Sequence, residues 1–152
     1  MYGFAYFLHI AGLAVWLGSL IGLGMLLQFI AKNQDMDKTN RLANHIVRLV
    51  NRLMHPSAFL VLLSGGYMLF ELGYGRDHPF WLIFMERFGS IVILLSIILI
   101  SIQGSKIKKV INGEKLKKEI TLSQALSRYN LMVWLSVVLV LIVTLVVSLK
   151  IV

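Results

Sequence analysis

The sequence predicts an all-α integral membrane protein, a bundle of four transmembrane helices. Of its 152 residues, 58% are hydrophobic and 14% are charged, whereas about a quarter of the residues in a soluble domain carry a charge. The apolar residues fall in four long runs. About 20 apolar residues in a helix cross the hydrocarbon core of a bilayer. The four runs therefore predict four membrane spans within a single domain, residues 1–152.

We expect the spans at residues 2–31, 53–72, 80–103 and 129–149. The first run has no basic n-region before it and no A-x-A-like site after it, so we expect it to stay as a span. The third run opens with aromatic side chains, as a segment at a membrane interface does. The fourth run is rich in Val and Leu on all sides.

Two basic linkers, residues 32–52 and 104–128, hold most of the 15 Lys and Arg residues. By the positive-inside rule both linkers face the cytoplasm and both termini face outside. In the first linker, Leu42, Ile46 and Leu49 form an apolar stripe opposite basic residues. We therefore expect a basic amphipathic helix at the level of anionic headgroups, before the second span. Orientation and anionic lipid explain the net charge of +8, so we exclude nucleic acid as a partner.

Composition and motifs exclude several other chemistries. The chain has no cysteine, which removes disulfides, thiol catalysis and iron–sulfur clusters. The sequence holds no phosphate-binding loop, no zinc H-E-x-x-H signature and no EF-hand pattern. No hydroxyl residue has a His and an acid at the spacing of a nucleophilic triad. Any chemistry must therefore come from the few ionisable residues within the spans.

His9 is the first of these residues, near the start of a span that otherwise holds no acid or base. An ionisable residue inside a span is a functional-site hypothesis by default. Two interpretations stay open. The imidazole is either buried and bonded to a backbone carbonyl or to Glu86, or it ligates haem iron or a metal ion.

Glu86 and Arg87 interrupt the third span about 10 Å from its outer end, at a depth similar to that of His9. One interpretation is an ion pair, formed with each other or with Glu71 and Arg76. The other is that Glu86 binds a cation, together with His9, while Arg87 holds a propionate or another anion. His45 and His55 lie at the cytoplasmic side, so the four histidines do not form one site.

Glycines give the first two spans small-residue surfaces. Gly18 and Gly22 have the G-x-x-x-G spacing that lets membrane helices pack closely. Gly12 shares a face with His9, and Gly65 and Gly66 form a second patch in the second span. Such faces predict the close approach of a neighbouring helix, a flat ligand, a second copy of the chain or another membrane protein.

Two stretches carry a resemblance to known families. Phe7-Leu8-His9-Ile10 followed by Val15-Trp16-Leu17-Gly18 resembles the first span of the copper-resistance D-like membrane proteins and of the related HemJ-type protoporphyrinogen oxidases. Pro56-Ser57-Ala58 leading to Ser64-Gly65-Gly66 resembles their second span. The resemblance covers most of the chain in its layout and a few motif residues in detail.

The resemblance implies that His9 is an axial ligand of haem b on the outer side, with Met85 or His78 as the second ligand. Haem iron accepts both the His/Met and the His/His pair. HemJ-type proteins follow their tryptophan with a Pro-Arg pair, which residues 19–24 lack, and place a Lys early in the third span, where this chain has Met85 and Glu86.

We therefore expect a multi-pass protein of the cell membrane, in a bacterium the plasma membrane, which contacts the bilayer and anionic cytoplasmic headgroups. Its expected function is to bind haem b, or alternatively copper, in the outer leaflet, with a redox, metal-handling or assembly role. A non-catalytic subunit that binds another membrane protein is the first alternative. A porphyrinogen oxidase of the HemJ type is the second.

Overall fold

The chain folds into helices throughout the part that the structure describes. This computed structural model describes residues 1–32, 36–73, 79–114 and 120–150, without the side chains of residues 31–40. The elements are α1 (Tyr2–Lys32), α2 (Met36–Leu49), η1 (Val50–Met54), α3 (His55–Leu72), α4 (Phe80–Phe84), η2 (Met85–Gly89), α5 (Ser90–Ile111) and α6 (Leu122–Leu149). Here η1 and η2 are single π-helical turns inside longer helices.

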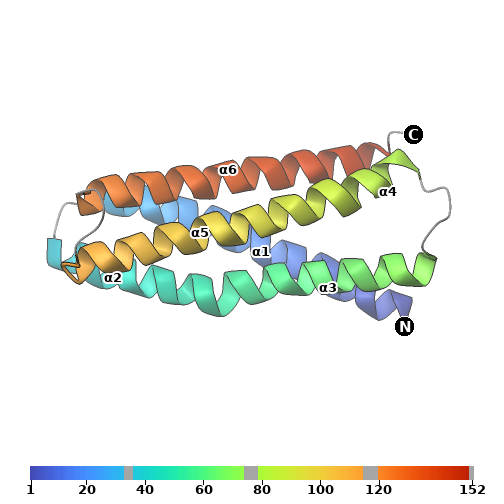
Figure 1. Ribbon diagram of the computed structural model, residues 1–152, viewed down its shortest axis with the longest axis horizontal. Helices are drawn as coiled ribbons and strands as arrows, with labels where there is room; N and C mark the ends of the chain where they lie inside the picture. Colours follow the sequence, from blue (N-terminus) through green and yellow to red (C-terminus); the bar gives the residue numbers. More distant parts are fainter. Residues whose placement is uncertain (33–35, 74–78, 115–119, 151–152) are drawn as a thin grey trace.

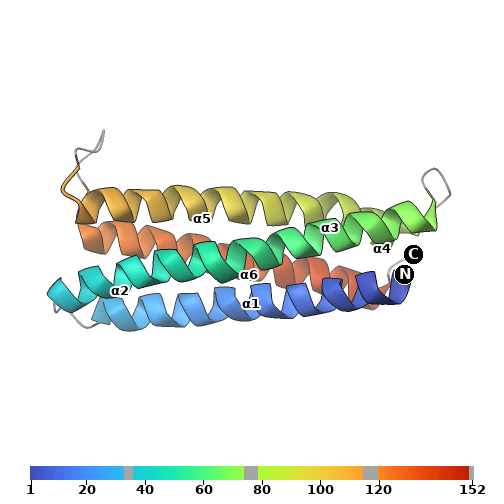
Figure 2. The ribbon, with the colours of Figure 1, turned by 90° about the horizontal axis from the view of Figure 1, so that it is seen from below.

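These elements form four long rods in an up-and-down bundle (Figure 1). The rods are α1, α2–η1–α3, α4–η2–α5 and α6. α1 packs against α3 and α6, and α5 packs against α6 and, less extensively, α3. Both termini lie at one end of the bundle, here called the terminal end, and the chain turns into the second and fourth rods at the other, the basic end (Figure 2).

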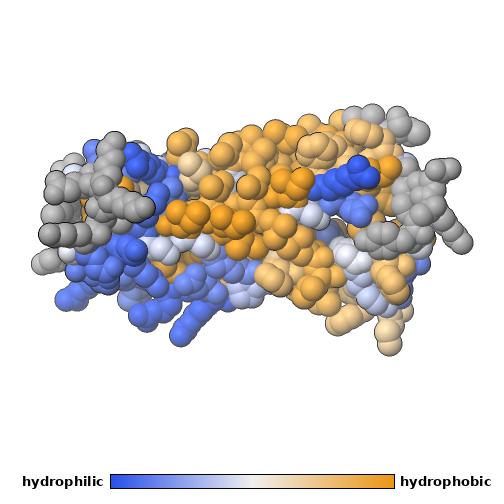
Figure 3. Space-filling view, viewed as in Figure 1, coloured by the Kyte–Doolittle hydropathy of each residue, from blue (hydrophilic) through white to orange (hydrophobic). Residues whose placement is uncertain are grey.

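The surface of the bundle is suited to lipid. Each rod holds a stretch long and apolar enough to cross a membrane: Tyr2–Ile30, Arg41–Leu72, Phe80–Ile111 and Leu122–Leu149. Most residues of these stretches are not buried inside the protein. Figure 3 shows hydrophobic residues over much of one face and hydrophilic residues gathered towards the basic end. Exposed apolar area on this scale requires a membrane or a partner, and the predicted four-helix membrane bundle is confirmed.

Two glycines of α1 set its distance from its neighbours. A Cβ atom at Gly12 would lie 3.0 Å from Cγ2 of Val61 and 3.3 Å from the backbone oxygen of Ser57. A Cβ atom at Gly24 would lie 2.9 Å from Nε1 of Trp134. α1 therefore approaches α3 near one end and α6 nearer the other. The core between the rods is filled by large side chains such as Trp16, which is 1% exposed.

The second rod differs from the expected pair of an amphipathic helix and a separate span beginning near residue 53. α2, η1 and α3 follow one another without a break. Pro56 has no N–H and cannot continue the ordinary helical hydrogen bonding. The preceding π-turn accommodates it, because the N–H of His55 bonds to the oxygen of Val50, five residues back. Pro56 thus lies inside the rod and not in its first turn.

The fourth rod also begins earlier than expected, at Leu122 instead of near residue 129. Thr121 and Gln124 form a capping box. The N–H of Gln124 donates to Oγ1 of Thr121 at 3.3 Å, and the N–H of Thr121 donates to Oε1 of Gln124 at 3.4 Å. This reciprocal pair satisfies two backbone N–H groups that a helix start leaves free. Likewise α5 continues to Ile111, past the expected end near residue 103.

We predict that Gly12→Leu lowers the melting temperature of the detergent-purified protein by several degrees, because the new side chain meets the backbone of α3. Overpacking of this kind costs about 1–3 kcal/mol. Gly22→Leu is the matched control, because nothing lies within 4 Å of a Cβ atom at that position. Thermal unfolding followed by circular dichroism measures both variants. Equal losses would contradict the α1–α3 packing described above.

Candidate functional site

His9 faces α3 and donates a hydrogen bond to its backbone. Nδ1 of His9 lies 3.0 Å from the oxygen of Val61 and 3.3 Å from Oγ of Ser64. A carbonyl oxygen only accepts, so Nδ1 must carry the proton. The hydroxyl of Ser64 in turn donates to the oxygen of Leu60, at 2.6 Å. These bonds select the tautomer of neutral His9 in which Nε2 keeps its lone pair.

Gly65 makes room for the imidazole. A Cβ atom there would lie 3.2 Å from Cε1 and 3.4 Å from Nδ1 of His9. Any side chain at this position would crowd the ring that bonds to Val61. Gly65, one of the two glycines in the small-residue patch of the second span, therefore accommodates His9.

The remaining glycines of the predicted packing faces have a different environment. At Gly18, Gly22 and Gly66, nothing in the described chain lies within 4 Å of an added Cβ atom. All three are exposed on the surface of the bundle. The G-x-x-x-G spacing of α1 thus points away from the described helices, whereas Gly12 lies against α3.

The other predicted ligands lie on a different element from the partners of His9. Met85 and Glu86 are half-buried and Arg87 is exposed in the π-turn η2. This turn continues directly into α5 and packs against α6, whereas the atoms that hold His9 come from α3. Among the described residues, no hydrogen bond or ion pair joins His9 to Glu86. His78 lies outside the described residues.

Glu86 and Arg87 form no ion pair with each other or with Glu71 in the part of the chain that the structure describes. Arg76, the fourth residue of the expected ion pairs, lies outside the described residues. Glu71 instead accepts a hydrogen bond from the hydroxyl of Tyr67 in the same helix. Across the described residues, no three His, Asp or Glu side chains converge as a metal site would require.

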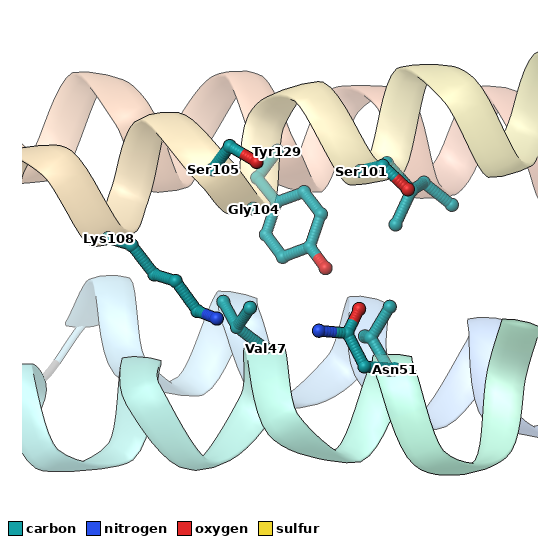
Figure 4. A pocket seen from close by; sticks show the side chains of 9 residues that line it. Val47, Asn51, Ser101, Gly104, Ser105, Lys108 and Tyr129 are labelled. Atoms are coloured by element: carbon teal, nitrogen blue, oxygen red, sulfur yellow. The ribbon is translucent and has the colours of Figure 1, made fainter.

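Sequence reasoning missed a polar pocket at the basic end. It lies between the α2–η1 segment and α5, with Tyr129 of α6 beside it, and has a volume of about 80 Å³ (Figure 4). Its polar side chains are Asn51, Ser101, Ser105, Lys108 and Tyr129. Beside the pocket, Nε2 of His55 lies 3.1 Å from Oγ of Ser101, and this hydrogen bond joins α3 to α5.

A model of one protein family matches residues 4–152, nearly the whole chain. The family is described as "Predicted integral membrane protein (DUF2269)". The chain belongs to this family. No curated protein and no solved structure matches it.

Membership in the DUF2269 family confirms the predicted location, because the description and the four membrane-spanning helices agree on a multi-pass membrane protein. The bilayer is therefore a partner of this DUF2269 protein. The description states location and no ligand.

Proposed function

We propose that this DUF2269 protein binds haem b at its terminal end, with Nε2 of His9 as an axial ligand to the iron. The observation that carries the proposal is the bond from Nδ1 of His9 to the oxygen of Val61. Metal-ligating histidines donate their other ring N–H to a carbonyl, a carboxylate or water, which fixes tautomer and orientation. His9 has this second bond, and its Nε2 has no partner among the described residues.

The donor set favours haem over copper. A haem carries the nitrogen ligands of its own macrocycle, so a single protein imidazole is enough to attach it, as the proximal His does in globins. A copper ion takes most of its ligands from the protein. In the described chain no three His, Asp or Glu side chains gather as a protein-bound copper ion would need. Copper bound by His9 and Glu86 is therefore the weaker form of the proposal.

Other residues near the terminal end suit the propionates and the second axial position of the proposed haem b. Arg87 offers an exposed guanidinium, which pairs well with a propionate carboxylate. Met85 lies in the π-turn η2, a distortion often found at functional sites. Either Met85 or His78 is the proposed second ligand. A bound haem b supplies one-electron redox chemistry. The chain supplies the oriented imidazole of His9 and a charge partner.

The resemblance to the copper-resistance D-like and HemJ-type proteins supports the same ligand, because His9 is the residue that matches their first span. Porphyrinogen oxidation finds less support. The Pro-Arg pair and the early Lys of the HemJ-type proteins have no counterpart at the matching positions of this chain. We therefore prefer a redox or assembly role for the bound haem over porphyrinogen oxidation.

A non-catalytic membrane subunit is the second candidate function. Gly18 and Gly22 are exposed, and a Cβ atom added at either would meet nothing within 4 Å in the described chain. Helices with this glycine spacing associate in membranes. Crosslinking of the purified protein tests this candidate. We expect Gly22→Leu to reduce self-association or the capture of a membrane partner, while His9→Ala leaves both unchanged. The opposite ranking would count against a subunit role.

Absorption spectroscopy tests the haem proposal. We predict that detergent-purified protein with added haem shows a Soret band that sharpens on reduction with dithionite, and that His9→Ala loses it because the iron has lost its protein ligand. His45→Ala is the control, since His45 is an exposed histidine near the basic end. Retention of the spectrum by His9→Ala, or a wild-type protein that binds no haem, would overturn the proposal. Copper content measured on the same samples decides the alternative.

A further inference from the structure

The pocket at the basic end contains a buried hydroxyl without a partner. Tyr129 is 0% exposed, and its hydroxyl has no hydrogen-bond partner among the described residues. Figure 4 shows its oxygen directed from the α6 side towards the segment that carries Asn51. A buried polar group normally finds a partner. The hydroxyl is thus positioned to donate to a ligand in the pocket.

Each of the other polar groups around the pocket can donate a hydrogen bond. Lys108 contributes an ammonium group, Asn51 an amide, and Ser101 and Ser105 hydroxyls. Among the described residues, no Asp or Glu lines the pocket and none forms an ion pair with Lys108. A cation surrounded by neutral donors and without a carboxylate is a site for an anion, because charge-assisted hydrogen bonds are stronger than neutral ones.

The lengths of the rods place this pocket at the membrane surface. About 20 residues at 1.5 Å each cross the hydrocarbon core. Counted from Phe80 at the terminal end, that length ends near Ile100, and counted back from Leu149 it ends near Asn130. Lys108 and Tyr129 therefore lie just beyond the hydrocarbon, where the phosphate groups of the leaflet at the basic end are found.

Together the geometry points to a binding site for the phosphate group of an anionic phospholipid. Lys108 provides the charge, and the hydroxyl of Tyr129 and the amide of Asn51 provide hydrogen bonds. The acyl chains then lie against the exposed apolar side chains of α5, among them Ile98 and Ile102. Basic pockets between membrane helices bind anionic headgroups in this way. This site is independent of His9 and of the haem proposal.

Native mass spectrometry tests the inference, with protein in a neutral detergent and either phosphatidylglycerol or phosphatidylcholine added. We expect the wild type to retain phosphatidylglycerol selectively. Tyr129→Phe and Lys108→Gln should each lower its affinity about tenfold, the effect of losing one hydrogen bond or charge to an ionised group. Lys109→Gln is the matched control, because it removes the same charge from an exposed neighbour that does not line the pocket.

Tyr129→Phe keeps the ring that fills the core, so it should fold and be at least as stable as the wild type without lipid. Unchanged binding by Tyr129→Phe and Lys108→Gln would overturn the site. An equal loss in Lys109→Gln would also overturn it, since the attraction would then come from the general surface charge. A second series uses inorganic phosphate as the probe. If phosphate binds in a Tyr129-dependent way and phosphatidylglycerol does not, the lipid assignment is overturned.

Discussion

The close contact between α1 and α3 is the constraint on which the rest of the structure depends. In the hydrocarbon core a polar group has no water to bond to, so it must find its partner within the protein. His9 finds that partner in the carbonyl of Val61. The bond is possible because Gly65 leaves space for the ring and Gly12 lets the helices approach. α1 also packs on α6, so its position influences most of the bundle.

The two ends of the bundle offer opposite chemistries. At the terminal end, His9 has committed its only proton donor to Val61 and offers a lone pair, which suits a metal or haem iron. At the basic end, Tyr129 and Lys108 offer donors and a positive charge, which suit an anion. The first arrangement suits the proposed haem iron and the second suits the proposed lipid phosphate. The two sites lie towards opposite ends of the second rod: Val61, which holds His9, and Asn51, which lines the pocket, are ten residues apart on it, about 15 Å at 1.5 Å per residue (Figure 1).

The sequence predicted the four spans because length and apolarity are properties of the chain itself. It did not predict where the helices end. The second span was expected to begin near residue 53, but a π-turn there carries the rod on through Pro56 without a break. Thr121 and Gln124 could have been identified as a capping box, which would have extended the fourth helix by about two turns.

The environment of each candidate residue depended on tertiary packing. A backbone carbonyl was one of the two interpretations of His9, but which carbonyl, and which nitrogen bonds to it, follow only from how α1 lies on α3. The glycine spacing identified small faces without showing that Gly12 turns inward while Gly18 and Gly22 turn outward. In the sequence, Tyr129 was only the first residue of the expected fourth span, and nothing in the pattern placed it in a pocket. The pocket that it lines is assembled from three separate rods.

The most direct test of this account is the protonation of His9, observed by nitrogen NMR on selectively labelled protein in detergent at neutral pH. The account predicts that Nδ1 carries the proton and Nε2 does not, and that the Nδ1 proton is protected from exchange by its bond to Val61. The exposed His45 serves as the internal reference. A His9 that carries its proton on Nε2 would contradict the account, because the nitrogen assigned to the iron would then have no lone pair to give.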